Sequence, residues 1–157
     1  MTADFPADRE LVLTRLIDAP REKVFRCWTQ PELLKLWFAP KPWTTPFAEL
    51  DVRPGGTNRI TMRSPEGQDM ANSGVYLEVA PNEKLVFTDA FAGAWTPRDG
   101  HPFMLAVLTF EDEDGKTRYT ARVRHWTTED AQRHEGMGFH HGWGICAEQL
   151  EAVAKTL

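Results

Sequence analysis

The stretch IDAPREKVFRCWTQPELLKLWF, residues 17–38, decides the fold of this chain. It begins as the end of a strand and then predicts two short helices. Pro20 suits the first position of a helix, where its missing N–H would be unpaired anyway. Asp18 lies close enough to cap this helix. The apolar side chains of the first helix share one face at helical spacing: Val24, Phe25 and Trp28.

The second helix has its own start signal. Thr29 is placed to cap it, Pro31 lies just inside it, and Glu32 completes an order that resembles a capping box. Its apolar face consists of Leu33, Leu34, Leu36 and Trp37. A strand followed by two short helices with aromatic inner faces needs a concave partner. The stretch therefore predicts a gripped sheet with a cavity, rather than a flat sandwich.

The middle of the chain predicts a meander of antiparallel strands. Apolar and polar residues alternate in short runs separated by turn signals such as Arg53-Pro54-Gly55-Gly56. A loop centred on Trp95 is expected over residues 92–101. Strands joined by short turns are typical of an antiparallel sheet in the α+β class. The predicted strands cover residues 10–17, 47–52, 58–63, 70–79, 84–91, 102–111 and 116–126.

A long helix is expected to end the chain and to cover the sheet. Residues 127–130 offer a helix start with acids near its positive end. Glycines at 136, 138 and 142 weaken its first half, and they would let it approach another backbone closely or bend around a cavity. The apolar stripe of its second half recurs at steps of three and four residues: Phe139, Trp143, Cys146, Leu150, Val153 and Leu157.

The composition limits the classes of function. The 157 residues predict one domain over 9–157, after a flexible N-terminus over 1–8. A net charge of −5 argues against nucleic-acid binding. The longest apolar run, residues 103–110, is too short to insert into a membrane, and the N-terminus does not resemble a signal peptide. We therefore expect a cytoplasmic protein in which Cys27 and Cys146 stay reduced.

The order of these motifs resembles a known family. The chain is similar to START-like, helix-grip proteins of the SRPBCC superfamily, and most similar to bacterial single-domain homologues of the activator of the heat-shock protein 90 ATPase. The resemblance covers roughly residues 9–157. It rests on Asp18-Ala19-Pro20 with Val24, Phe25 and Trp28; Pro31-Glu32 with Leu34 and Trp37; Pro54-Gly55-Gly56; Gly74 to Val79 with Pro81; Lys84 to Thr88; and His134 to Leu150, with Gly142-Trp143.

The resemblance implies a fold and a range of functions. The expected fold is a curved antiparallel sheet of about six to seven strands wrapped around a long C-terminal helix, with two short helices after the first strand. Related families bind lipids, sterols, plant hormones or polyketides, and some cyclise aromatic polyketides. One such fold hosts many functions, so the family alone does not identify a ligand.

The histidines near the terminal helix do not predict a metal site. No His-Glu-x-x-His motif is present, and no further ligand set accompanies them. His134 and His141 are seven residues apart and are expected on one solvated helix face. His140 is expected beside Trp143, on the core or pocket side. We accordingly expect neither a metal nor a cofactor.

Two residues are candidate acid–base groups. His125 continues the inward-facing series Tyr119, Ala121 and Val123, so it is expected near the interior. It would serve there either as a hydrogen-bonded structural residue or as a catalytic group. Asp89 either faces inward between aromatic residues or lies exposed at a loop edge, and the cost of burying a charge favours the edge.

The main functional hypothesis is a binding protein for a small hydrophobic or aromatic molecule held between the sheet and the terminal helix. The alternatives are a polyketide-cyclase-like or hydrolase-like enzyme using the same cavity, and a cofactor of a heat-shock protein 90 chaperone. The same aromatic residues would otherwise simply fill the core. An exposed strand edge could also pair two copies into a homodimer. The expected ligand-binding residues are Trp28, Trp37, Phe38, Trp43, Met62, Tyr76, Phe87, Phe91, Trp95, Phe103, Leu105, His125, Phe139 and Trp143.

Overall fold

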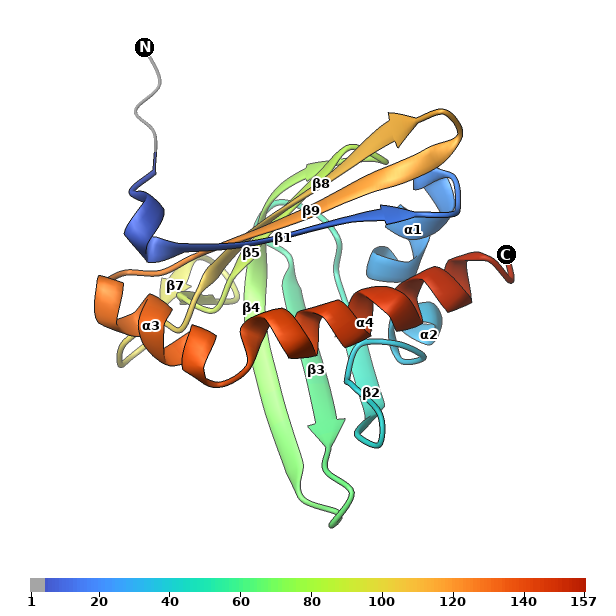
Figure 1. Cartoon of the computed structure of the whole chain (residues 1–157). Coiled ribbons are helices and arrows are strands. Elements are labelled where there is room, and N and C mark those ends of the chain that lie inside the picture. Colours follow the sequence, from blue (N-terminus) through green and yellow to red (C-terminus); the bar gives the residue numbers. More distant parts are fainter. Residues whose placement is uncertain (1–4) are drawn as a thin grey trace.

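The computed structural model describes residues 5–157 and consists of a strongly twisted antiparallel sheet with a long helix across it (Figure 1). Seven strands form this sheet in the order β1-β9-β8-β5-β4-β3-β2, which confirms the predicted α+β class and strand number. Their bounds are β1 Glu10–Ile17, β2 Thr44–Leu50, β3 Thr57–Arg63, β4 Asp69–Ala80, β5 Lys84–Thr88, β8 Leu105–Glu113 and β9 Lys116–Arg124.

The remaining elements are short, apart from the C-terminal helix. The predicted loop over 92–101 contains a small hairpin of β6 (Phe91–Ala92) and β7 (Thr96–Pro97). Strands β5 and β8 are shorter at this end than expected, because the chain leaves the sheet after Thr88 and rejoins it at Leu105. The helices are η1 Ala7–Arg9, α1 Arg21–Thr29, α2 Pro31–Leu34, α3 Thr128–Gly136 and α4 Phe139–Ala154.

The predicted single terminal helix is wrong, since the chain forms two helices there. Helix α3 ends at Gly136, and α4 begins after Gly138, whose φ of +96° lies in the left-handed region. Glycine reaches this region without the Cβ clash that other residues suffer. The break changes the direction of the chain, so α3 and α4 can contact different parts of the sheet (Figure 1).

The expectation that these glycines allow close backbone contact is also wrong. Apart from chain neighbours and the backbone of its own helix, a Cβ at Gly136, Gly138 or Gly142 would meet no atom of the described chain within 4 Å. The crowded helix glycine is Gly144, where a Cβ would lie 3.0 Å from Nη2 of Arg15. That neighbour is the tip of a flexible side chain. The structure supports the other predicted role of these glycines, a bend, because the chain changes direction at Gly138.

Both expected side-chain caps of the early helices are absent. The N-cap residues are Pro20 for α1 and Gln30 for α2, and neither makes a side-chain capping bond. The backbone N–H of Asp18 instead donates to Glu151 of α4 at 2.7 Å. Thr29 donates its hydroxyl to the carbonyl of Phe25 at 2.9 Å. These residues stabilise the turns through contacts other than the predicted caps.

The core lies between α1, α4 and strands β8 and β9. Phe25 of α1 meets Phe110 of β8 edge to face, with ring centroids 5.5 Å apart. Tyr119 and Leu150 are fully buried beside them. Edge-to-face aromatic pairs stabilise the core beyond the apolar area that they bury.

The N-terminal segment is described from Phe5 onward, and residues 1–4 of the predicted flexible terminus lie outside the described residues. The ring of Phe5 lies beneath two guanidinium groups, 5.1 Å from Arg9 and 4.9 Å from Arg124. Asp8 accepts a hydrogen bond from Thr128 at the start of α3. These contacts attach the beginning of the described chain to the sheet and to α3.

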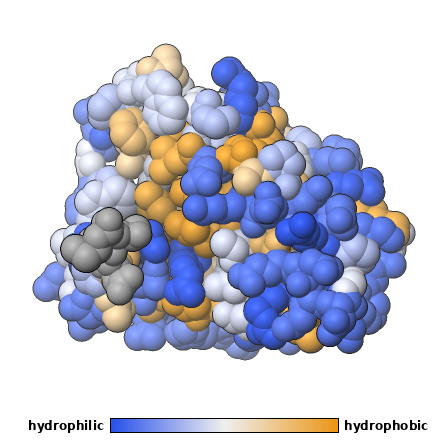
Figure 2. Space-filling view, turned by 90° about the horizontal axis from the view of Figure 1, so that it is seen from above, coloured by the Kyte–Doolittle hydropathy of each residue, from blue (hydrophilic) through white to orange (hydrophobic). Residues whose placement is uncertain are grey.

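The surface carries apolar side chains among charged ones, and Figure 2 shows such an area bordered by hydrophilic residues on the face seen from above. Strands β1 and β2 are the two edges of the sheet. Val12 and Leu16 of β1 are 37% and 47% exposed. Because an unpaired edge can accept another strand, the homodimer stays a prediction.

Two glycines give a test of this fold. Gly74→Ala would place a Cβ 2.2 Å from the carbonyl oxygen of Thr88, so it should lower the free energy of unfolding by about 1–3 kcal/mol. Gly142→Ala is the control, since its Cβ meets open space in α4 and alanine favours helix by about 1 kcal/mol. Urea unfolding followed by circular dichroism should give shifts of opposite sign. Equal shifts would contradict the β4–β5 packing described here.

Candidate functional site

The face of the sheet toward α4 is tightly closed over strands β1, β9 and β8. Its side chains form rows across the strands, set by the antiparallel register. One row joins Leu13, Ala121, Leu108 and Leu85, and each of these side chains is at most 3% exposed. Helices α1 and α4 cover this half, which leaves no room for a ligand.

The other half of the same face, over β2 to β5, remains partly open. Its apolar side chains pack against the core, yet they are only partly buried. We call this set the half-buried apolar surface. It includes residues from β2, β5, α4 and the connections around them. Its members are Phe38, Ala48, Leu50, Phe87, Met104 and Trp143.

An amide side chain ties α4 to the connection after α2. Gln149 donates through Nε2 to the carbonyls of Trp37 and Ala39, both at 2.9 Å. Its Oε1 accepts from the backbone N–H of Lys41 at 3.0 Å. Three hydrogen bonds from one side chain therefore hold this connection against the helix. No sequence pattern singled out Gln149, because its partners are backbone groups more than a hundred residues away.

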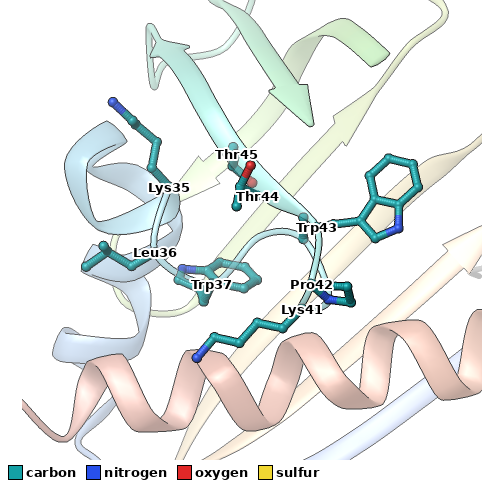
Figure 3. Close-up of a pocket in the computed structure, with 9 residues that line it drawn as sticks. Lys35, Leu36, Trp37, Lys41, Pro42, Trp43, Thr44 and Thr45 are labelled. Carbon is teal, nitrogen blue, oxygen red and sulfur yellow. The ribbon is translucent and has the colours of Figure 1, made fainter. Parts of the chain in front are cut away.

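A surface cleft of about 440 Å³ lies along the same connection (Figure 3). Trp37 and Thr45 are buried in its wall, whereas the side chain of Trp43 extends away from Trp37. The hydroxyl of Thr45 is enclosed and has no hydrogen-bond partner among residues 5–157. The cleft is lined by Lys35, Leu36, Trp37, Ala39, Lys41, Pro42, Trp43, Thr44 and Thr45.

Two histidines meet at the other end of α4. Nε2 of His125 lies 2.9 Å from Nδ1 of His134, and Nδ1 of His125 lies 3.0 Å from the carbonyl oxygen of Arg9. His125 is 1% exposed and His134 is 7% exposed. The inward position predicted for His125 is confirmed. The solvated position predicted for His134 is wrong, and the break after α3 separates it from His141, with which it was expected to share a face.

The other histidines lie at the surface. His140 contacts Glu135 at 3.3 Å and is exposed, so its predicted core-side position is wrong. His141 is exposed as well, and it does not share the surroundings of His134. His101 pairs with Asp130, which holds the pKa of that carboxyl below its usual range.

Asp89 lies at the loop edge, as the sequence favoured. Its carboxylate accepts the backbone N–H of Phe103 at 2.8 Å and that of Met104 at 3.1 Å. These bonds fix the point at which the chain re-enters the sheet at β8. Because its oxygens are used in this way, Asp89 is a structural residue in the described chain.

The predicted ligand-binding residues therefore separate into groups. Trp28, Trp37, Tyr76, His125 and Phe139 are buried, while Trp95 and Phe103 are exposed. The half-buried ones are Phe38, Trp43, Met62, Phe87, Phe91, Leu105 and Trp143.

Three of these residues lie apart from the half-buried apolar surface. Leu105 pairs with Arg124 and alternates with the fully buried Ala106, so it faces outward into a hollow of about 260 Å³. Phe91 and Trp95 pack together, with ring centroids 5.8 Å apart, and a Cβ at Gly55 would lie 3.0 Å from the indole of Trp95. They hold the β6–β7 hairpin against the turn before β3.

Sequence reasoning missed Ala48, Leu50, Met104 and His134 as residues of the inner region. Met104 could have been found, since it alternates in step with Ala106 and Leu108. His134 could not, because its direction depends on the helix break at Gly138.

The described residues contain no metal site, no membrane-spanning helix and no reactive thiol. Within residues 5–157, no three His, Cys, Asp or Glu side chains converge to hold a metal ion. No helix of this part of the chain has the length and apolar character needed to cross a membrane. Cys27 and Cys146 are free thiols, and burial raises their pKa values to about 11 and about 12. They remain protonated and unreactive at neutral pH.

Comparisons with known proteins agree with this architecture. The model of the family described as activator of Hsp90 ATPase homolog 1-like protein matches residues 18–155. A crystal structure from Nitrosomonas europaea is similar with a TM-score of 0.93 and 40% identity, over 97% of both chains. A Mycobacterium smegmatis protein has a TM-score of 0.79 and 26% identity, over 93% of this chain and 90% of its own. No curated protein matches the sequence.

The histidine pair predicts a pH-dependent stability. Burial, followed by the nearby His125, lowers the pKa of His134 from 6.5 to about 4. Above about pH 6.5 the imidazole is neutral in both the folded and the unfolded state. Between about pH 6.5 and 4 the unfolded state alone binds the proton, so the free energy of unfolding should fall by roughly 3 kcal/mol.

Urea unfolding at several pH values between about 7 and 4.5 measures this loss. His134→Phe should flatten the slope, whereas His141→Phe, at an exposed position, should retain it. Charged groups around the pair include Arg9, which donates to the carbonyl of His125, and Asp130 of the same helix as His134, which is paired with His101. Arg124, Arg133 and Glu135 are chain neighbours of the two histidines. If the free energy of unfolding of His134→Phe still falls with pH as in the wild type, groups other than His134 cause the loss of stability.

Proposed function

The chain belongs to the family of activator of Hsp90 ATPase homolog 1-like proteins, and on this premise we propose that it binds a small hydrophobic or aromatic molecule between the sheet and α4. The half-buried apolar surface is the observation that carries the proposal. It lies on the face of the sheet toward α4, and a ligand placed there would cover it. Each square ångström of apolar area removed from water contributes about 25 cal/mol.

The aromatic groups beside this surface favour a flat ligand. Trp28 lies under it and contacts Phe87 and Phe38, with centroid distances of 5.7 Å and 6.0 Å. Trp143 is the member of this surface that comes from α4, and its ring centroid lies 5.2 Å from that of Phe139. A ring entering between them would find both faces and edges of aromatic partners, which are the arrangements that such pairs prefer.

The two alternative functions have less support. An enzyme of the cyclase or hydrolase kind would need an acid–base group that is free to exchange a proton with the substrate. The carboxylate of Asp89 already accepts hydrogen bonds from backbone N–H groups. His125 likewise uses both ring nitrogens in hydrogen bonds. A chaperone-cofactor role rests on the family description alone. Binding without reaction is therefore the function that the geometry favours.

A pair of variants on one strand tests the proposal. We expect 2-methylnaphthalene to bind the wild type saturably, measured by isothermal titration calorimetry. Leu50→Asp places a charge on the half-buried apolar surface and should weaken binding at least tenfold, about 1.4 kcal/mol. Phe47→Asp introduces the same residue at a position of β2 that is 43% exposed, so it should leave affinity unchanged.

The result has two clear failures. If 2-methylnaphthalene does not bind the wild type saturably, the proposal is wrong for apolar ligands of this size. Equal affinities of the wild type and Leu50→Asp would show that the ligand binds outside the half-buried apolar surface. The cleft beside Trp43 would then be the next region to change, because its volume of about 440 Å³ is within the range of small-molecule sites.

A further inference from the structure

The hydrogen bonds of the histidine pair determine where its protons lie. The carbonyl oxygen of Arg9 can only accept, so Nδ1 of His125 must carry the proton in the contact of 3.0 Å between them. Nε2 of a neutral His125 then has a lone pair, and it accepts from Nδ1–H of His134 at 2.9 Å. Both imidazoles are consequently held as Nδ1–H tautomers. Nε2 of His134 is left as a hydrogen-bond acceptor.

This nitrogen has no partner of its own. His134 is 7% exposed, and among the described residues its Nε2 makes no hydrogen bond, whereas Nδ1 makes one. Among the described residues, the side-chain polar atoms that are both fully enclosed and without a partner are Nε1 of Trp28 and Oγ1 of Thr45, and Nε2 of His134 is not one of them. An unpaired acceptor in an apolar setting costs free energy unless a donor reaches it. Nε2 of His134 is accessible enough for such a donor.

Aromatic contacts connect His134 to the half-buried apolar surface. Its ring lies 5.2 Å from that of Phe139, and Phe139 in turn lies 5.2 Å from Trp143, a member of that surface. The imidazole also lies 4.6 Å from the ring of Phe103, whose neighbour Met104 belongs to the surface. The acceptor therefore lies at one end of an otherwise apolar region.

We propose that Nε2 of His134 is the hydrogen-bond acceptor of the ligand site, and that the ligand is a neutral aromatic alcohol, such as a phenol, which donates its O–H to this nitrogen. The inference rests on the proposed function. His134 is the binding residue, and His125 is a positioning residue that fixes the tautomer of His134. Only a proton-bearing ligand group complements a lone pair.

The surroundings exclude charged alternatives. A carboxylate or phenolate would bring a second lone pair against Nε2, and the neighbouring side chains Phe103 and Phe139 supply no compensating charge. The imidazole does not become a cation to receive an anion near neutral pH, because the pKa of His134 is about 4. An ammonium group would lose its hydration among aromatic side chains. A neutral hydroxyl avoids each of these costs.

The tautomers can be measured directly in the wild type by long-range proton–nitrogen correlation spectroscopy of the imidazoles at neutral pH. We expect protonated Nδ1 and unprotonated Nε2 for both His125 and His134. On titration with 2-naphthol the Nε2 signal of His134 should shift, and 2-methylnaphthalene should leave it in place. A proton on Nε2 of His134 in the free protein would overturn the inference.

Affinities of the same two probes give the second test. The preference for 2-naphthol over 2-methylnaphthalene should fall about two- to tenfold in His134→Phe, which is the range for one net hydrogen bond. His141→Phe is the matched control, since His141 is exposed in α4, and it should keep the wild-type preference. His125→Phe should reduce the preference too, and His134 should then show a mixture of tautomers.

The outcomes separate the two proposals. If both probes bind and the preference is unchanged in His134→Phe, the inference fails and the proposed function stands. If neither probe binds the wild type, the proposed function fails for ligands of this size and the inference fails with it. Should His134→Phe not fold, the nitrogen shifts of the wild type still decide the question.

Discussion

The antiparallel register of the large sheet is the constraint on which the rest of the structure depends. It aligns Leu13, Ala121, Leu108 and Leu85 in one row across four strands. A shift of one residue in any strand would turn its apolar side chains to the opposite face. The row gives α1 and α4 a continuous apolar surface, and their contact with it closes one half of the inner face. The half over β2 to β5 is partly open because α1 and α4 cover its side chains less completely than those of β1, β9 and β8.

The sequence predicted those features of the fold and the site that depend on neighbouring residues, and it missed those that depend on contacts between residues far apart in the chain. The strands, the two early helices and the inward series ending at His125 follow local periodicity, and the structure confirms them. The caps of the early helices failed because Asp18 and Thr29 found other partners. His134 was misplaced since a heptad spacing to His141 assumes one unbroken helix, and Gly138 interrupts it. Gln149 had no local signature.

Polar contacts close the apolar interior at both ends of α4. At its C-terminal half, the amide of Gln149 binds three backbone groups of the connection after α2. Near its N-terminus, His134 and His125 join α3 to the end of β9 and to the carbonyl of Arg9. Buried polar groups need partners, and each satisfied group restricts the geometry of the element that carries it. The two ends of the helix are thereby fixed while the apolar surface between them stays partly open.

The difference between these two closures bears on function. Gln149 uses its oxygen and its amide protons in the closure, so nothing of it remains for a ligand. The histidine pair uses three of its four ring nitrogens and leaves one. His134 and His141 differ in their surroundings because the chain breaks between them at Gly138, so the heptad spacing does not place them on one face.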